Sequence, residues 1–168
     1  MSAGPHNKLR RQSRLSAIQA LYQMEVSGLT SKQVTMEFLN HRFGYDGEEN
    51  MVAADEAFFE DIVAGVVKRQ DEIDKMIVDN LSEKWSMKRL DLTLRAILRS
   101  GAYEILQRPD VPALVIIDQY VSIAADFHAD NQTGFINRVL ENMANSVRQA
   151  EFGTVSYTHL TLPTTPYV

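Results

Sequence analysis

Four basic residues open the first predicted helix, in the stretch KLRRQSRLSAIQALYQ. They are Lys8, Arg10, Arg11 and Arg14, and no acidic residue lies among them. Arg10 and Arg14 are four positions apart, so they share one face of a helix. Such side chains bind phosphate backbones without reading the base sequence. The pattern indicates either a contact for nucleic-acid phosphate or a solvated helix start that only aids solubility.

A second candidate is the stretch DFHADNQTGFINRVL, residues 126–140. Asp130 or Asn131 is a good N-cap, so a helix is predicted to begin there, and a helix N-terminus can receive phosphate. Phe127 precedes this cap, and Phe135 lies one residue, or about 100°, from the apolar stripe of the helix. An exposed phenylalanine can stack on an unpaired RNA base. The residues alone favour the alternative, in which both rings lie at the edge of the core.

Other residue types that carry chemistry do not form a recognisable site. The chain has no cysteine, which excludes disulfides, thiolate nucleophiles and cysteine-ligated metals. No two of the four histidines have the spacing of metal ligands. Asp71, Glu72 and Asp74 are explained by a solvated helix face. Asp118 is predicted to cap a helix or to be a buried polar residue, and Trp85 is predicted to be an anchor in the core. We therefore predict a protein that is not an enzyme and that holds no metal or cofactor.

Apolar residues at helical spacing position these candidates along the whole chain. The length of 168 residues suits one domain, with 45% apolar residues and 17 basic against 22 acidic residues, a net charge of -5. No segment alternates with a period of two over a convincing length. We predict an all-α bundle of about seven helices with short loops. No apolar run is long enough for a membrane span or a signal peptide, so a cytoplasmic location is expected.

Several residues mark the predicted ends of these helices. The first helix should stop at Gly28, and Thr30 with Gln33 forms the pattern of a capping box for the next. The long helix that begins near residue 90 should end before Pro109, and Pro112 lies near the start of the following helix.

Residues 1–150 are predicted to form a single helical domain. If the domain has an internal boundary, the best candidate for it is the stretch around residues 80–90. Gly65 and Gly101 lie inside predicted helices and indicate close helix packing. Residues 151–168 contain five threonines, two prolines and no lysine or arginine, and they begin with Glu-Phe-Gly-Thr, which resembles translated restriction sites. We interpret this segment as a non-native tail.

Four stretches, in this order and spacing, resemble the NusB family of bacterial transcription antitermination factors. They are SRLSAIQALYQMEVSG at 13–28, FFEDIVAGV at 58–66, LRAILRSGAYEIL at 94–106 and FINRVLENMA at 135–144, and the family's loop RPDVP follows the third. The resemblance covers residues 9–148 and implies an all-helical fold of two subdomains without catalysis.

The resemblance also implies partners. NusB proteins bind single-stranded BoxA RNA of ribosomal-RNA leader transcripts as a heterodimer with a small ribosomal protein, also called NusE. The pair joins an antitermination complex that helps RNA polymerase pass terminators. Some members also self-associate, so a homodimer is possible for the free protein.

By the same resemblance, Tyr22 matches a residue near the partner and RNA surface. The positions that match the family's RNA-contacting segments are Arg10, Arg11, Arg14, Phe127, Asn131 and Phe135. The chain departs from the family pattern at Leu94, where an acidic residue is usual. It also lacks the basic residue before Phe135 and carries Arg138 after it.

Two other function classes remain open from the sequence. A NusB-like module occurs at the N-terminus of some ribosomal-RNA cytosine methyltransferases, but no cofactor-binding βαβ pattern and no catalytic cysteine follow here. A helical interaction protein without an RNA role is the second alternative. It predicts that Arg10, Arg11 and Arg14 can be replaced without loss of function.

Overall fold

The computed structural model describes residues 5–44, 51–127 and 130–149. The proposed tail at 151–168, together with His128 and His159, lies outside these residues.

The described residues form seven α-helices, as predicted. They are α1 (Pro5–Ser27), α2 (Ser31–His41), α3 (Glu56–Lys68), α4 (Gln70–Asp79), α5 (Leu92–Gln107), α6 (Ala113–Asp126) and α7 (Thr133–Val147). Two short 3-10 turns, η1 (Met87–Arg89) and η2 (Asp130–Gln132), precede α5 and α7. Extended pairing within the described ranges is limited to one isolated bridge between Phe43 and Val52.

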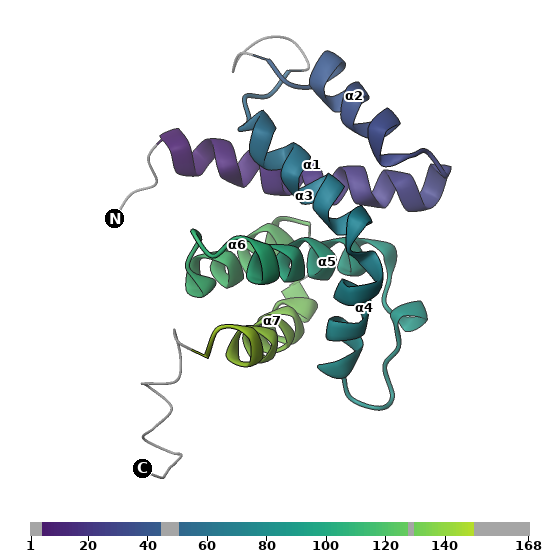
Figure 1. Cartoon of the computed structure of the whole chain (residues 1–168), viewed down its shortest axis with the longest axis vertical. Helices are drawn as coiled ribbons and strands as arrows, with labels where there is room; N and C mark the ends of the chain where they lie inside the picture. The colour runs from purple at the N-terminus through teal and green to yellow at the C-terminus, as the bar shows by residue number, and fades with distance from the viewer. Residues whose placement is uncertain (1–4, 45–50, 128–129, 150–168) are drawn as a thin grey trace.

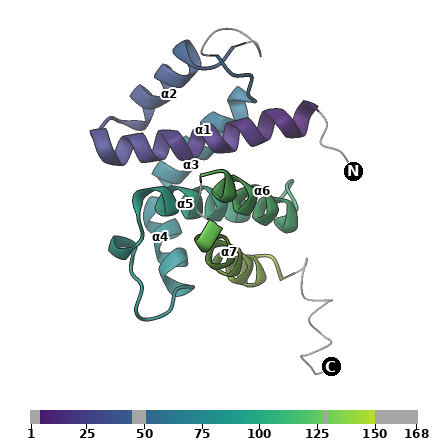
Figure 2. The ribbon, with the colours of Figure 1, turned by 180° about the vertical axis from the view of Figure 1, so that it is seen from behind.

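The helices form two groups that meet at α5. Helices α1, α2 and α3 form the first group and α4 to α7 the second, with α1 and α3 lying against α5 (Figures 1 and 2). Nearly every residue of α5 from Leu94 to Ile105 is buried, as expected for a helix that is covered on all sides. The chain crosses between the groups at Arg69, so the predicted seam at 80–90 lies instead within the second group.

The predicted helix ends are confirmed where local chemistry decides them. The Thr30 side chain accepts from the Gln33 N–H at 3.2 Å, and Gln33 Oε1 accepts from the Thr30 N–H at 2.9 Å. Gly28 has φ of +77°, a left-handed conformation that glycine adopts without steric cost. Helix α5 ends before Pro109, and Pro112 is the N-cap of α6.

Two glycines set the distances of α5 from its neighbours, as predicted. A Cβ atom at Gly65 of α3 would lie 2.1 Å from Cε1 of Tyr103 on α5. A Cβ atom at Gly101 of α5 would lie 2.9 Å from Cδ2 of Leu140 on α7. The Tyr103 hydroxyl donates to Asp61 at 2.8 Å, and burial, followed by this hydrogen bond, raises the pKa of Tyr103 to about 12. The tyrosine therefore stays a neutral donor between α3 and α5.

A cluster of charged side chains joins α1, α4 and α5. Arg99 of α5 donates to both carboxylate oxygens of Asp74, at 2.8 and 2.9 Å, and to Glu25 at 2.7 Å. The prediction of a solvated acidic face holds for Asp71 and Glu72, which are exposed, but it is wrong for Asp74. None of the helices that the structure describes is long and apolar enough to cross a membrane.

Candidate nucleic-acid interface

Three residues that the sequence singled out meet in one groove. Tyr22 of α1, Phe127 at the end of α6 and Asn131 of η2 line a hollow of about 560 Å³, together with Asp91, Leu92, Thr93 and Gln132. A second hollow of about 480 Å³ shares Tyr22, Thr93 and Phe127 and continues along α1 past Ile18 and Val26. We call the two together the α1–α5 groove. Segments that are about 100 residues apart in the chain therefore form one surface.

The helical period of α1 supplies one wall of this groove. Arg11, Leu15, Ile18 and Tyr22 follow each other at intervals of four, three and four residues, so they lie on one face. Phe127 closes α6, and its N–H donates to the carbonyls of the last turn. The phenylalanine ring is half-buried against the core, which fixes its position at the groove.

Asp91 connects the start of α5 with the segment that precedes α7, and both line the groove. Its Oδ1 accepts from the Leu94 N–H at 2.8 Å and so caps α5, while its Oδ2 accepts from the Gln132 side chain at 3.2 Å. Helix α7 begins later than predicted, because η2 starts at Asp130 and Gln132 is the N-cap residue, with no side-chain cap hydrogen bond. This leaves the Asn131 side chain exposed at the groove.

The groove offers rings and amides. Tyr22 is 42% exposed and Phe127 lies beside it, so both can stack on planar groups. Asn131 and Gln132 carry both donors and acceptors, which match the edges of unpaired bases. Asp91 is engaged in the contacts that shape the groove. The groove therefore suits bases better than phosphates.

Arg11 pairs with the residue that precedes Phe127, a lining residue of the groove. Its guanidinium makes an ion pair with Asp126, the last residue of α6. The Arg11 side chain is 33% exposed and that of Asp126 is 69% exposed. A phosphate can compete for a cation in so open a pair, because exposed ion pairs contribute little.

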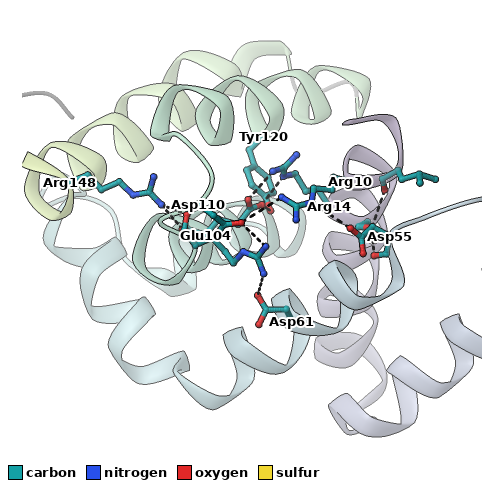
Figure 3. A network of polar contacts seen from close by, with 11 residues as sticks. Arg10, Arg14, Asp55, Asp61, Glu104, Asp110, Tyr120 and Arg148 are labelled. Atoms are coloured by element: carbon teal, nitrogen blue, oxygen red, sulfur yellow. Dashed lines mark hydrogen bonds and ion pairs between the residues drawn. The ribbon is translucent and has the colours of Figure 1, made fainter. Parts of the chain in front are cut away.

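Arg14 has a different place, in the core (Figure 3). It donates from Nε and Nη2 to the two carboxylate oxygens of Glu104 at 2.8 and 3.0 Å, and Glu104 is fully buried. The Tyr120 hydroxyl donates to the same carboxylate. Arg14 itself is 3% exposed, so in this structure its charge faces Glu104 and is not accessible to RNA.

The protonation states keep this network intact. Burial lowers the pKa of Arg14, but the hydrogen bonds and charge of Glu104 raise it by more, so the net direction is up. Burial, and then the charge of Glu104, raises the pKa of Tyr120 well above its usual value. Arg14 therefore stays charged and Tyr120 remains a donor.

Arg10 shares a face with Arg14, as predicted, but this face packs on the protein. The Arg10 guanidinium lies 4.3 Å from the centre of the Phe58 ring, 3.5 Å from Asp55 and 3.9 Å from Asp110. Figure 3 shows Arg10 and Arg14 side by side between α3 and α5. With a side-chain exposure of 21%, Arg10 is only partly accessible.

Phe135 lies outside the groove, at the edge of the core. Its ring contacts Trp85, with ring centres 5.6 Å apart. The prediction of Trp85 as a core anchor is wrong, because 39% of its surface is exposed. Asp118, predicted in a capping or buried polar role, is exposed on α6.

Sequence reasoning missed Glu104, although a signal was present. Glu104 follows Ile97 and Gly101 at helical spacing, so it lies on an apolar stripe of α5. Arg14 likewise precedes Ile18 and Leu21 on the stripe of α1. Opposite charges on two apolar stripes indicate a buried pair, because a buried charge needs a partner.

Metal sites and histidine chemistry receive no support from the geometry of the described ranges. His6 and His41 are exposed, and no group of three or more side chains there could hold a metal ion.

The profile of the NusB family matches residues 11–145. The transcription antitermination protein NusB of Maricaulis maris is 50% identical over 146 residues, which are 86% of this chain and 91% of that protein. The NusB protein of Caulobacter vibrioides is 49% identical over 140 residues, 83% of this chain and 94% of that protein. These relatives are antitermination factors, which confirms the prediction that the chain is not an enzyme.

Solved structures agree on the fold. A structure of T. maritima NusB has a TM-score of 0.72 and 28% identity to this chain, and the match covers 91% of this chain and 99% of that one. A crystal structure of the antitermination factors NusB and NusE in complex with dsRNA has a TM-score of 0.69 and 21% identity, over 83% and 98% of the two chains. Family profile, relatives and fold agree, and the chain belongs to the NusB family.

Proposed function

We propose that this chain binds single-stranded BoxA RNA of ribosomal-RNA leader transcripts together with NusE. The pair then acts within the antitermination complex of RNA polymerase, in the cytoplasm. Family membership supports this function, and a protein of the same fold has been crystallised with NusE and RNA.

The observation that carries the proposal is the α1–α5 groove. Tyr22 belongs to the first basic stretch, Phe127 and Asn131 both belong to residues 126–140, and all three line the groove. Their rings and amide suit stacking and hydrogen bonding to unpaired bases. This convergence supports a base-reading role for the groove.

Phosphate contacts are assigned to the outer face of α1. Arg11 pairs with Asp126 beside the groove residue Phe127, and Lys8 is exposed one turn earlier on the same helix. Arg10 contributes less to phosphate binding, because Phe58 and two carboxylates hold its side chain. Arg14 supports RNA binding indirectly, through its buried ion pair with Glu104. Few phosphate contacts imply weak, salt-sensitive affinity for RNA when the protein acts alone.

NusE is assigned to the apolar part of the groove along α1. Ile18, Val26 and Phe127 line this part, and Tyr22 stands where it joins the base-reading part. A partner seated here would cover apolar surface and extend the RNA site. Self-association of the free protein through the same face would compete with both.

The test compares a BoxA strand with a scrambled strand, with and without NusE. Asn131→Ala should weaken selective binding, because a base edge loses its hydrogen-bonding partner. Asn145→Ala is the matched control, since Asn145 is an exposed amide on α7 outside the groove. Tyr22→Ala should reduce the gain in affinity that NusE provides.

Selective binding that is unaffected by Asn131→Ala and Tyr22→Ala would contradict the assignment of the groove. Equal, feeble binding to both strands, unmoved by NusE, would favour a helical interaction protein without an RNA role.

A further inference from the structure

A large aromatic side chain lies exposed next to the start of α7. Trp85 belongs to the connection between α4 and α5, which runs along the outside of α4 (Figure 1). Its ring centre is 5.6 Å from that of Phe135, with 50° between the planes. Trp85 is the only tryptophan of the chain and is 39% exposed. The contact with Phe135 holds the ring in place while part of its surface faces solvent.

The chain segments that carry the two rings are rich in basic residues. Residues 82–89 carry Lys84, Lys88 and Arg89 against the single acid Glu83. Arg138, one turn after Phe135, places its guanidinium 5.9 Å from the Phe135 ring centre.

These cations differ from those of α1 in their partners. Arg10, Arg11 and Arg14 all pair with carboxylates of the protein. Within the described ranges, by contrast, the basic side chains of residues 84–89 and Arg138 form no ion pair with a carboxylate. An anionic ligand would therefore contact these basic side chains without first breaking an ion pair within the protein.

Two chain segments lead from the wall of the α1–α5 groove to Trp85 and to Phe135. The hydrogen bond between Gln132 and Asp91 joins the two segments at the groove wall. From there one segment leads back through η1 to Trp85, and the other leads one turn forward to Phe135. A strand that leaves the groove over this wall would reach the aromatic pair.

We propose that Trp85, with Phe135, Lys84, Lys88 and Arg138, forms a second surface for single-stranded RNA, the Trp85 platform. It binds the nucleotides that flank the segment held in the groove, by base stacking and phosphate contacts. An apolar protein partner fits less well, because the segments that carry the two rings are rich in basic residues and Arg138 lies over the Phe135 ring. The proposal rests on the proposed function for the path of the RNA.

Tryptophan fluorescence of the full chain tests the platform directly, because Trp85 is the only source of the signal. The probes are a minimal BoxA strand, the same strand extended by several nucleotides at either end, and oligouridine. The extended strand should quench Trp85 and the minimal strand should not. Oligouridine should also quench at high concentration, since stacking tolerates any base. This last result does not depend on BoxA reading, so it separates failure of the platform from failure of the proposed function.

Variants give the size of the effect. Trp85→Ala should weaken binding of the extended strand roughly 5- to 160-fold, the loss expected for one stacked base, and leave the minimal strand unchanged. Trp85→Phe should retain most of the affinity, which distinguishes stacking from a folding defect. The double variant Lys84→Gln, Lys88→Gln should reduce the steepness of log K against log salt by about 1.4. The control is the double variant Lys32→Gln, Lys68→Gln, at exposed positions elsewhere, which should leave this slope unchanged.

The proposal is overturned if neither the extended strand nor oligouridine changes Trp85 fluorescence. It is also overturned if Trp85→Ala binds the extended strand as tightly as the unchanged protein. A fluorescence change on adding NusE alone, with no further change on adding RNA, would assign the surface to the protein partner instead.

Discussion

Replacing Asp126 by asparagine should tighten RNA binding. Asp126, next in the chain to the groove residue Phe127, holds the Arg11 guanidinium, and RNA must displace this carboxylate before a phosphate can take its place. Asp126→Asn keeps the shape of the side chain but removes its charge. Arg11 is then available to phosphate without loss of an internal ion pair.

The expected gain follows from the exposure of the pair. With side-chain exposures of 33% and 69%, it belongs with solvent-screened pairs worth about 0.2–1 kcal/mol. Recovering this energy in the complex corresponds to an affinity roughly 1.4- to 5-fold higher. Removal of a negative charge also improves RNA binding non-specifically, so this contribution needs a separate control.

Asp118→Asn provides that control. Asp118 is exposed on the same helix, its replacement changes the net charge equally, and it forms no ion pair in the described part of the chain. Fluorescence polarisation of a labelled BoxA strand, with NusE present and at two salt concentrations, gives both affinities. The gain should be larger for Asp126→Asn, and adding Arg11→Gln to that variant should abolish the excess. Equal gains in the two variants would show that Arg11 does not contact RNA.

Three further predictions concern the frame that holds the groove, and urea unfolding followed by circular dichroism measures each of them. Arg14→Met should lower the free energy of unfolding by about 3–5 kcal/mol, because Glu104 is left buried and unpaired, and a much smaller loss would mean that Glu104 becomes neutral or solvated. Gly65→Ala should cost about 1–3 kcal/mol, since the new methyl group would lie 2.1 Å from the Tyr103 ring; an unchanged midpoint would show that this ring moves freely. Thr30→Ala removes the capping box of α2 and should cost about 1 kcal/mol, while no loss would indicate that solvent caps the helix equally well.

Local features of the fold could be predicted because a few neighbouring residues decide them. The capping box at Thr30 and the end of α1 at Gly28 depend on chemistry within one turn of helix. The seven helices likewise follow from apolar periodicity. Asn131 shows the limit, because a 3-10 turn took the place of the predicted cap and moved the start of α7 by one to two residues.

Exposure could not be predicted in the same way, because it depends on the partner helix. The sequence placed Trp85 in the core, yet it packs beside Phe135 with 39% of its surface exposed. The opposite error occurred at Arg14, where a charge suggested solvent. Charge alone suggests that a side chain is exposed. When a cation lies on the apolar stripe of one helix and a carboxylate such as Glu104 lies on the apolar stripe of another, the two positions together indicate a buried pair.

The two faces of α1 therefore have separate tasks that depend on each other. On the inner face, Arg14 binds Glu104 and fixes α1 against α5. On the adjoining face, Arg11 and Tyr22 meet the end of α6 and the start of α5, where the groove forms. Since one helix carries both faces, the depth at which Arg14 is buried also sets the distance from Tyr22 to Thr93 and Phe127. Loss of RNA binding after an Arg14 substitution would then be expected even though Arg14 is buried against Glu104. If the folded molecules of an Arg14 variant bind RNA as tightly as the unchanged protein, this coupling between the two faces is wrong.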